Sequence, residues 1–392
     1  FFCALNKYHT VKVRNLTVGG SWSGYNNTPH DGESYITDEM KEMLHQQTLV
    51  NNDNSRTDYP IYGHDPNFKP DVHIVLMENN SHYYYDNYEG YKIAYCVWES
   101  TRFSDSFFKR LLTFDEMWVP SQWQYDCIVE QGYPKERVFI VPEGVDVDTF
   151  KPTNKTIKTK KTKFVLFGRW EWRKGTTEIL QAFSEEFKDT DNVELIASVE
   201  NPYPSDGLKT TEERIKHYGI DTKKIKFINF PSRDEYVRYL QEANVFVSCA
   251  RSEGWNLPLI EAMACGTPSI YSNWGGQLQF TSGGGLPVDI KGLTPANHEH
   301  KDFPGDYCEP DWEDLRWKMR QAYDYDTAMW ITAKSDSERI HKDFNWDTIA
   351  KGACKILENK FDDFAFITTG NIGYMPVIEK LVQSLLEFSK RK

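Results

Sequence analysis

Short apolar runs alternate along the chain with segments whose apolar positions recur every three or four residues. The runs are rich in β-branched and aromatic residues, which are typical of strands, and the periodic segments between them predict amphipathic helices. Ser121 and Ser232 are predicted N-caps of two of these helices. Runs that are apolar almost throughout indicate parallel sheets covered on both faces. The predicted strands are 71–77, 91–97, 116–119, 137–142, 163–168, 193–198, 225–230, 245–250 and 268–272.

A polar segment rich in lysine, 151–163, divides this pattern into two series. Two series of alternating strands and helices predict an α/β protein with two Rossmann-like domains, whose parallel sheets face a cleft between them. We expect an N-terminal domain at 1–151 and a C-terminal domain at 152–344. A further amphipathic helix, at 345–361, follows the second series.

Composition narrows the class of protein. The chain has 392 residues, of which 15% are aromatic, and these supply material for large cores. Its formal net charge of -12 argues against a partner that is a nucleic acid or a membrane surface. The seven cysteines are scattered without a Cys-x-x-Cys pair, so we expect buried thiols in a reducing compartment, the cytoplasm. No apolar run is long enough to span a membrane, so we expect no integral membrane segment.

The stretch ARSEGWNLPLIEAMACGTP, residues 250–268, places two glutamates around a predicted strand-to-helix loop. Asn256 is the predicted N-cap of a helix that begins near residue 257, and ligands bind at such loops in open α/β sheets. The free amides at the start of the helix favour an anion. Glu261, one turn into the helix, is placed to accept hydrogen bonds from vicinal hydroxyls such as those of a ribose, and Glu253 to accept one from a sugar. The other interpretation is that both carboxylates complement the helix dipole or face solvent.

A second group of candidates lies in FGRWEWRKG, residues 167–175, which follows the first strand of the second series. Arg169 and Lys174 stand five positions apart in a strand-to-helix loop, so both side chains can converge on one anionic group such as a diphosphate. The alternative is a solvated basic loop. We expect Arg173, in the same loop, to lie on the surface.

Glycines and acidic pairs give weaker signals. Gly275 and Gly276 in SNWGGQLQF allow a backbone to approach a ligand closely, or they only shape a turn. The Asp-x-Asp sequences at 146–148 and 324–326 lie in a hinge segment and a polar stretch, and we interpret both as coincidental. The histidines of NHEHK have no partners at metal-ligand spacing, so we expect no metal site.

Three motifs in this order, VPEGVDVDTF, GRWEWRKG and SEGWNLPLIEAMACGTP, resemble those of GT-B glycosyltransferases of family 4. The resemblance covers roughly residues 1–361 and is strongest over 115–280. It implies a retaining, hexosyltransferase-like enzyme that moves a sugar from a nucleotide-diphosphate sugar to a glycan or other acceptor. It also implies that the helix at 345–361 returns to the N-terminal domain.

The resemblance assigns catalytic roles to Arg169, Lys174 and Glu253. The two cations would neutralise the leaving diphosphate, Glu253 would hold the donor sugar, and Glu261 would bind the nucleotide ribose. Transfer would proceed by front-face attack, without an enzymatic nucleophile and without a metal or other cofactor. The remaining residues of the implied donor site are Gly254, Trp255, Asn256, Leu257, Gly275 and Gly276.

The N-terminal domain departs from the family pattern. Many relatives have a histidine near the end of the strand that corresponds to 71–77, whereas here His82 follows that strand by a few residues. His82 and Glu99, which follows the next strand, are candidates for this side of the site, and a structural role is the alternative for either. The chain begins FFCALNKYH without a methionine, so we expect the family's first strand to precede Phe1.

After residue 361 the segment FAFIT is followed by a glycine turn and a helix-like pattern. This segment resembles the first strand and helix of GT-A nucleotide-sugar transferases. We expect residues 364–392 to begin a further domain of a longer glycosyltransferase, and the alternative is an extension packed on the two-domain unit.

Two other functions stay open for the chain. One is a non-catalytic module that binds a sugar nucleotide, and the other is a GT-B nucleotide-sugar epimerase or inverting transferase.

Overall fold

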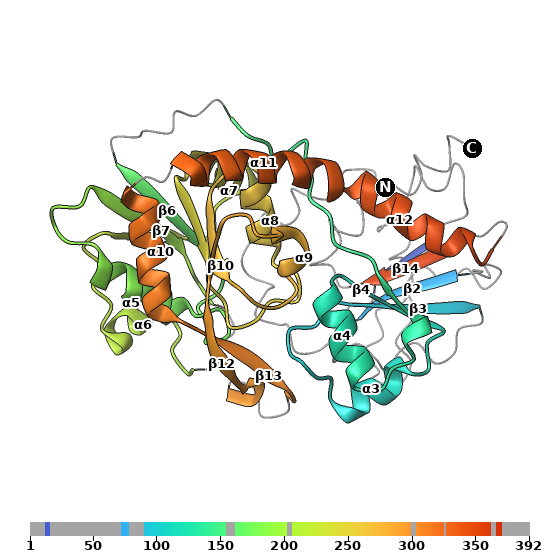
Figure 1. The fold of residues 1–392 in the computed structure, drawn as a ribbon. Helices are drawn as coiled ribbons and strands as arrows, with labels where there is room; N and C mark the ends of the chain where they lie inside the picture. Colours follow the sequence, from blue (N-terminus) through green and yellow to red (C-terminus); the bar gives the residue numbers. More distant parts are fainter. Residues whose placement is uncertain are drawn as a thin grey trace, which may run out of the picture.

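The computed structural model describes residues 12–15, 72–77, 90–153, 161–201, 206–298, 303–324, 327–361 and 366–370. These residues form two six-stranded parallel sheets and one two-stranded antiparallel sheet. Figure 1 shows the two large sheets side by side, with helices around each of them and two long helices running along one edge of the molecule. The predicted α/β class with two parallel sheets is confirmed.

The first large sheet has the order β1-β14-β2-β3-β4-β5, and all neighbouring strands are parallel. Its inner strands are apolar because side chains on both faces are buried, as Ile93 and Ala94 of β3 are. Helix α4 begins at the predicted N-cap, where the Ser121 hydroxyl accepts a hydrogen bond from the amide of Gln124. The elements are β2 (Val72–Met77), β3 (Tyr91–Cys96), α3 (Asp105–Leu111), β4 (Glu116–Val119), α4 (Gln122–Glu130), a 3-10 helix (Lys135–Arg137) and β5 (Val138–Ile140).

A strand from the end of the chain lies inside this first sheet. Strand β14 (Phe366–Gly370) pairs in parallel with β1 (Lys12–Asn15) on one side and with β2 on the other. The strand that we expected to open a further domain therefore belongs to the N-terminal sheet, as the alternative of a packed extension describes. Residues 371–392 lie outside the described part of the chain, and for them the further domain stays a prediction.

The second large sheet has the order β11-β10-β9-β6-β7-β8 and is also parallel. Each predicted strand of the second series is present, although β8 ends at Phe227 rather than at residue 230. Ser232 is confirmed as the N-cap of α7, where it forms a capping box with Glu235. The strands are β6 (Thr162–Phe167), β7 (Val193–Ser198), β8 (Ile225–Phe227), β9 (Val245–Ser248), β10 (Ser269–Ser272) and β11 (Leu286–Val288). The helices are α5 (Thr176–Glu186), α6 (Thr211–Tyr218), α7 (Arg233–Glu242), α8 (Leu257–Ala264), α9 (Leu278–Thr281), a 3-10 helix (Ala296–His298) and α10 (Trp312–Asp324).

A hairpin that the sequence pattern did not predict extends from the second domain to the first (Figure 1). It consists of β12 (Ile290–Pro295) and β13 (Asp306–Pro310). Next to the hairpin, the ring of Phe303 stacks on that of Trp98, with the centroids 4.9 Å apart. The amide of Thr101 donates to the first carbonyl of β13 at 3.3 Å. The hairpin therefore ties the two domains together.

Two helices carry the chain back from the second domain to the first (Figure 1). Helix α11 (Thr327–Asp343) packs beside α8, and α12 (Trp346–Glu358) reaches the first sheet. Just after α12, the Lys360 ammonium forms an ion pair with the buried carboxylate of Glu116 in β4. The helix predicted at 345–361 is confirmed.

The cysteines agree with the expectation of buried thiols. Every cysteine in the described part of the chain is buried and outside any disulfide, as their spacing predicts. Within the same residues, no helix combines the length and the apolar character that crossing a membrane requires.

Candidate active site

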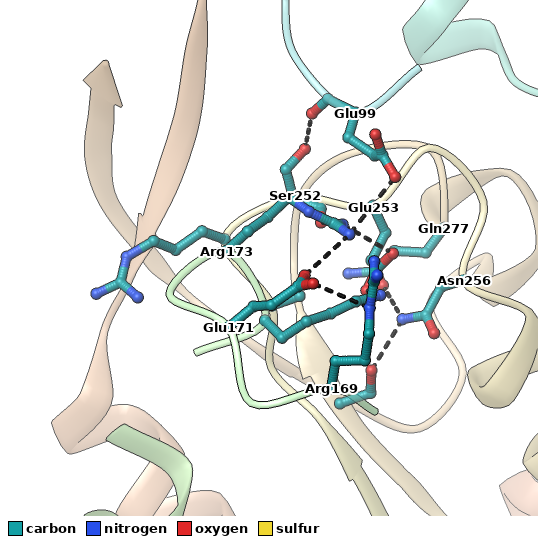
Figure 2. Close-up of polar contacts among 12 residues, drawn as sticks. Glu99, Arg169, Glu171, Arg173, Ser252, Glu253, Asn256 and Gln277 are labelled. Carbon is teal, nitrogen blue, oxygen red and sulfur yellow. Dashed lines mark hydrogen bonds and ion pairs between the residues drawn. The ribbon is translucent and has the colours of Figure 1, made fainter. Parts of the chain in front are cut away.

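The two domains touch at the loops that follow the carboxyl ends of β3 and β9. The hydroxyl of Ser252 donates to the backbone carbonyl of Glu99. A Cβ on Gly254 would lie 2.8 Å from the carbonyl oxygen of Trp98, so only glycine allows this approach. The loop between β6 and α5 reaches the same place, and side chains of three loops therefore meet there (Figure 2).

Glu253 lies in the loop after β9, and only 5% of the residue is exposed. Its Oε1 accepts a hydrogen bond from the Lys174 ammonium at 2.5 Å, and its Oε2 accepts one from the Arg173 guanidinium at 3.3 Å. Burial alone would raise the pKa of Glu253, but the charges of Lys174 and Arg173 outweigh burial and lower that pKa. Glu253 is therefore a buried carboxylate that two cations of one loop hold in its ionised form.

Arg173 is buried, so the expectation of a surface position is wrong. Its Nη1 donates to the carbonyl of Ser252 at 2.8 Å. Its guanidinium forms ion pairs with the carboxylates of Glu99, Glu171 and Glu253 (Figure 2). Burial alone would lower the pKa of Arg173, but these carboxylates raise it well above its ordinary value. The local sequence gave no signal for this role, because two of the three carboxylates lie on loops that follow other strands.

Arg169 and Lys174 lie on the loop between β6 and α5, as predicted. The Arg169 side chain is 42% exposed, and its Nε lies 2.9 Å from Glu171 Oε1. The Lys174 side chain reaches Glu253 instead. In this structure the two cations therefore hold different carboxylates of the same site and do not converge on one group.

Glu261 lies one turn into α8, with 15% of its side chain exposed. The Tyr236 hydroxyl of α7 donates to its Oε2 at 2.5 Å, and Nη1 of Arg233 lies 4.0 Å from its Oε1. Burial raises the pKa of Glu261 to about 7, and the Tyr236 hydrogen bond and the Arg233 charge offset this effect only in part. The carboxylate therefore lies against α7 and not in open solvent.

Asn256 is confirmed as the N-cap of α8, and it adopts a left-handed conformation with φ of 82°. Its Oδ1 accepts from the amide of Leu259 at 3.3 Å. Its Nδ2 donates to Gln277 Oε1 at 2.7 Å and to Ser248 Oγ at 3.0 Å. Gln277 is fully buried and in turn donates to the carbonyl of Ser272, so these side chains join the loops that follow β9 and β10. Gln277 was not among the predicted site residues, and its position beside the paired glycines was the only signal for it.

The paired glycines let two loops approach each other. Gly275 has a φ of 89°, which few other residues adopt. A Cβ on Gly276 would lie 1.7 Å from the carbonyl oxygen of Gly254. The amide of Gly276 donates to the carbonyl of Glu253 at 2.9 Å. In this structure the glycines approach the loop that carries Glu253, and their predicted approach to a ligand stays a prediction.

The side chain of Trp255 belongs to the core. It is 1% exposed, and its ring centroid lies 4.9 Å from that of Phe280 and 6.0 Å from that of Phe344. Leu257 is the first residue of α8 and is partly buried. Contacts of Trp255 with a ligand would therefore come from its backbone amide, two residues before α8 begins.

Of the two candidates in the N-terminal domain, the structure brings Glu99 to the site. Its Oε1 lies 3.5 Å from Nη2 of Arg173. His82 lies outside the described residues. Within the described ranges, which also leave out His300, no group of three or more His, Cys, Asp or Glu side chains could hold a metal ion.

Part of the chain is similar to known glycosyltransferases. Residues 147–285 match the family described as Glycosyl transferases group 1. The mannosylfructose-phosphate synthase of Agrobacterium fabrum is 24% identical over 250 residues, which cover 60% of this chain and 51% of that protein. A D-inositol 3-phosphate glycosyltransferase of Corynebacterium urealyticum is 28% identical over 180 residues, which cover 41% of this chain and 42% of that protein. The chain spans about half the length of the curated relatives it matches.

Solved structures of glycosyltransferases share the fold. A glycosyltransferase from Rickettsia africae has a TM-score of 0.62 at 12% identity, over 89% of this chain and 97% of that one. The sucrose-phosphate synthase of Thermosynechococcus elongatus has a TM-score of 0.54 at 21% identity, over 70% and 69%. The fold is therefore that of the GT-B glycosyltransferases, and residues 147–285 within it match the family Glycosyl transferases group 1.

Proposed function

We propose that this chain is a retaining GT-B glycosyltransferase of family 4 that moves a hexosyl unit from a nucleotide-diphosphate sugar to a glycan or other acceptor. The observation that supports this most is the buried, ionised Glu253 between Lys174 and Arg173, just before the N-terminus of α8. Buried charges are expensive, and they cluster where a reaction moves charge. The segment that matches the group 1 family, residues 147–285, includes Glu253, Lys174 and Arg173.

The leaving group of such a reaction is a nucleoside diphosphate, on which negative charge builds up. Lys174 and Arg169 supply two positive charges from one loop, and the free amides at the start of α8 add the favourable end of a helix dipole. When the donor binds, Lys174 exchanges Glu253 for a phosphate oxygen, and Glu253 accepts a hydrogen bond from the donor sugar. Because side chains and amides offset the phosphate charge, we propose that the reaction needs no metal ion.

We propose front-face attack by the acceptor hydroxyl. The bond from the anomeric carbon to the phosphate oxygen breaks while the bond to the acceptor oxygen forms on the same face of the sugar. The hydroxyl proton passes to the leaving phosphate oxygen. Glu253 needs no nucleophilic role in this step, because the acceptor hydroxyl attacks the anomeric carbon directly. With the donor bound, Arg173 still contacts Oε2 of Glu253.

We assign Glu261 to the ribose of the donor nucleotide. A carboxylate accepts hydrogen bonds from two vicinal hydroxyls best when it is ionised. The pKa of Glu261 is about 7 without a ligand, so binding of the ribose should favour loss of its proton. The Tyr236 hydroxyl holds one of the two oxygens and fixes the plane of the carboxylate.

Relatives provide the first donors to test. HepE of Anabaena was solved in complex with UDP-glucose, and a relative from Xanthomonas oryzae is named as a mannosyltransferase that uses GDP-mannose. Buried cysteines outside any disulfide, in the described part of the chain, support a reducing location, and we propose the cytoplasm.

The test is thermal unfolding with UDP-glucose, GDP-mannose, UDP and GDP, followed by assays of donor hydrolysis and sugar transfer. A ligand at 100 times its Kd stabilises the protein by about 2.7 kcal/mol, so specific binding is readily detected. We expect one sugar nucleotide to raise the melting temperature and Glu261→Ala to remove most of that rise. We also expect Arg169→Ala to lower turnover by on the order of 10²-fold, and activity to survive EDTA.

Other outcomes would identify other functions. Binding without hydrolysis or transfer would favour a non-catalytic sugar-nucleotide module. Release of an epimerised sugar nucleotide without an acceptor would indicate an epimerase. Activity that EDTA abolishes and a divalent ion restores would refute the metal-free mechanism.

A further inference from the structure

The Arg173 guanidinium joins side chains from three loops (Figure 2). Its Nη2 lies 3.5 Å from Glu99 Oε1, in the first domain, and 3.6 Å from Glu171 Oε2, in its own loop. Its Nη1 lies 3.3 Å from Glu253 Oε2 and donates to the carbonyl of Ser252 at 2.8 Å. Only 10% of the side chain is exposed. One buried cation therefore faces three carboxylates, and one of these belongs to the other domain.

The two cations that contact Glu253 differ in their mobility. Lys174 has a flexible stem, and 23% of its side chain is exposed, so it can turn toward an incoming anion. Arg173 has a planar fork that Ser252 and three carboxylates hold in place. When Lys174 moves to a diphosphate, Arg173 remains beside Glu253.

The contact between Arg173 and Glu99 crosses the domain junction. The backbone carbonyl of Glu99 accepts a hydrogen bond from Ser252, and the preceding residue packs against Gly254. The Glu99 carboxylate therefore stays at Arg173 only while the two domains are in contact. When the domains separate, Arg173 loses the carboxylate that lies on the opposite side of the junction from Glu253.

We propose that Arg173 is a positioning residue that bridges Glu99 and Glu253 and so orients the Glu253 carboxylate for the donor sugar only when the two domains are closed. The inference rests on the proposed function, because it takes Glu253 as the group that holds that sugar. Arg173 itself touches no reacting atom. Glu253 then takes the orientation that the donor sugar needs only when the domains close. A donor bound in the open form is therefore protected from hydrolysis by water.

A purely structural role predicts different results. An arginine that only stabilises its loop would change the amount of folded protein, and it would leave the pH profile and the coupling to Glu99 unchanged. Residues that share one interaction show non-additive effects when both are replaced. The combined replacement of Arg173 and Glu99 therefore separates the two roles.

Small-angle X-ray scattering of the full chain without ligand tests the bridge independently of activity. Arg173→Gln and Glu99→Gln should each raise the radius of gyration, and the double variant should raise it no further, because both changes remove the same ion pair. Arg173→Lys should restore part of the compaction. The control is Arg238→Gln, which removes an arginine that is 58% exposed and pairs within α7. Radii equal to that of the wild-type protein in all variants would overturn the bridge.

Kinetics with whichever of UDP-glucose and GDP-mannose the wild-type chain hydrolyses test the positioning. Arg173→Gln should lower kcat by on the order of 10²-fold with KM within about threefold, and Glu99→Gln should lower kcat by about tenfold. The double variant should be no slower than Arg173→Gln, and Arg173→Lys should recover part of kcat. Effects that multiply in the double variant would contradict the proposal, as would a higher KM at unchanged kcat.

The pH profile provides a further readout. Lys174 and Arg173 are the charged groups that lower the pKa of Glu253, so Arg173→Gln should move the acid limb of kcat to higher pH. An unchanged acid limb would indicate a merely structural arginine. If the wild-type chain uses no tested donor, the proposed function fails, and the scattering result decides whether the bridge exists. If Arg173→Gln does not fold, Glu99→Gln tests the bridge from its partly exposed side.

Discussion

Replacing Glu261 with glutamine should stabilise the ligand-free protein at pH 8 and remove part of the pH dependence of its stability. Burial raises the pKa of Glu261 to about 7 in the folded state, from an ordinary value of 4.5. Between these pH values the folded protein keeps a proton that the unfolded chain has lost. The free energy of unfolding must therefore fall as the pH rises through this window, because the carboxylate has to ionise in a buried site.

The magnitude follows from the two pKa values. Their difference of about 2.5 corresponds to on the order of 3 kcal/mol of unfolding free energy lost above pH 7. Glutamine keeps the shape of the side chain and accepts the hydrogen bond from Tyr236 without a charge. The free energy of unfolding of the variant should therefore exceed that of the wild-type protein by roughly 2 to 3 kcal/mol at pH 8 and by little at pH 5.

Urea unfolding followed by tryptophan fluorescence at pH 5, 6.5 and 8 measures this difference. Burial also raises the pKa of Glu143 to about 8, which adds a pH dependence of the same sign to both proteins, so only the difference between them reports on Glu261. The control is Glu338→Gln on the exposed face of α11, which should follow the wild-type protein at every pH. Equal stability of the wild-type protein and Glu261→Gln at all three pH values would refute the reasoning. Glu261→Gln should at the same time weaken nucleotide binding, because a stabilising change at a binding carboxylate removes the charge that the ligand uses.

Four further predictions concern other contacts. Glu253→Ala should lower kcat by on the order of 10²-fold, while the Kd for the nucleoside diphosphate, measured by calorimetry, stays within about threefold of the wild-type value. An unchanged kcat would show that Glu253 is not part of the site. Lys174→Ala should lower kcat by on the order of 10²-fold or more in the same assay, and activity near that of the wild-type protein would contradict its contact with the leaving group. Gly276→Ala should lower the unfolding free energy by about 1 to 3 kcal/mol, because the added Cβ would lie 1.7 Å from a carbonyl oxygen, and unchanged stability in urea would show that the two loops separate easily. Lys360→Met should lower the free energy of unfolding by about 2 kcal/mol, because the buried Glu116 loses its cation. Adding Glu116→Gln should recover part of this loss, and no recovery would argue against the ion pair.

Local signals in the sequence were enough to place most elements of the site. Asn256 caps α8 as predicted, because a cap depends on its own side chain and on an amide three residues away. The loops that carry Lys174 and Glu253 meet the first domain because they follow strands of one parallel sheet, whose carboxyl ends share an edge. Apolar runs determine those strands, so the sheet and its edge could be predicted.

Arg173 shows where such reasoning ends. Its neighbours in the chain make it look like one more cation of a solvated loop, and its partner Glu253 lies 80 positions away. Its burial depends on packing against loops that are far away in the chain. The same holds for Gln277, whose partner Asn256 lies on another loop, and for the hairpin that reaches Trp98.

The place of β14 in the first sheet has a consequence for the order in which the chain folds. Phe366 pairs with Val72, which lies 294 positions earlier, whereas the second sheet takes all its strands from 162–288. During synthesis the second domain can complete its sheet first, while the first sheet waits for a strand that leaves the ribosome much later. Until that strand arrives, β1 and β2 present unpaired amides and carbonyls that invite pairing with other chains. The segment 366–370 therefore completes the first sheet late in synthesis. Chains released without it should aggregate through the open edge of β2.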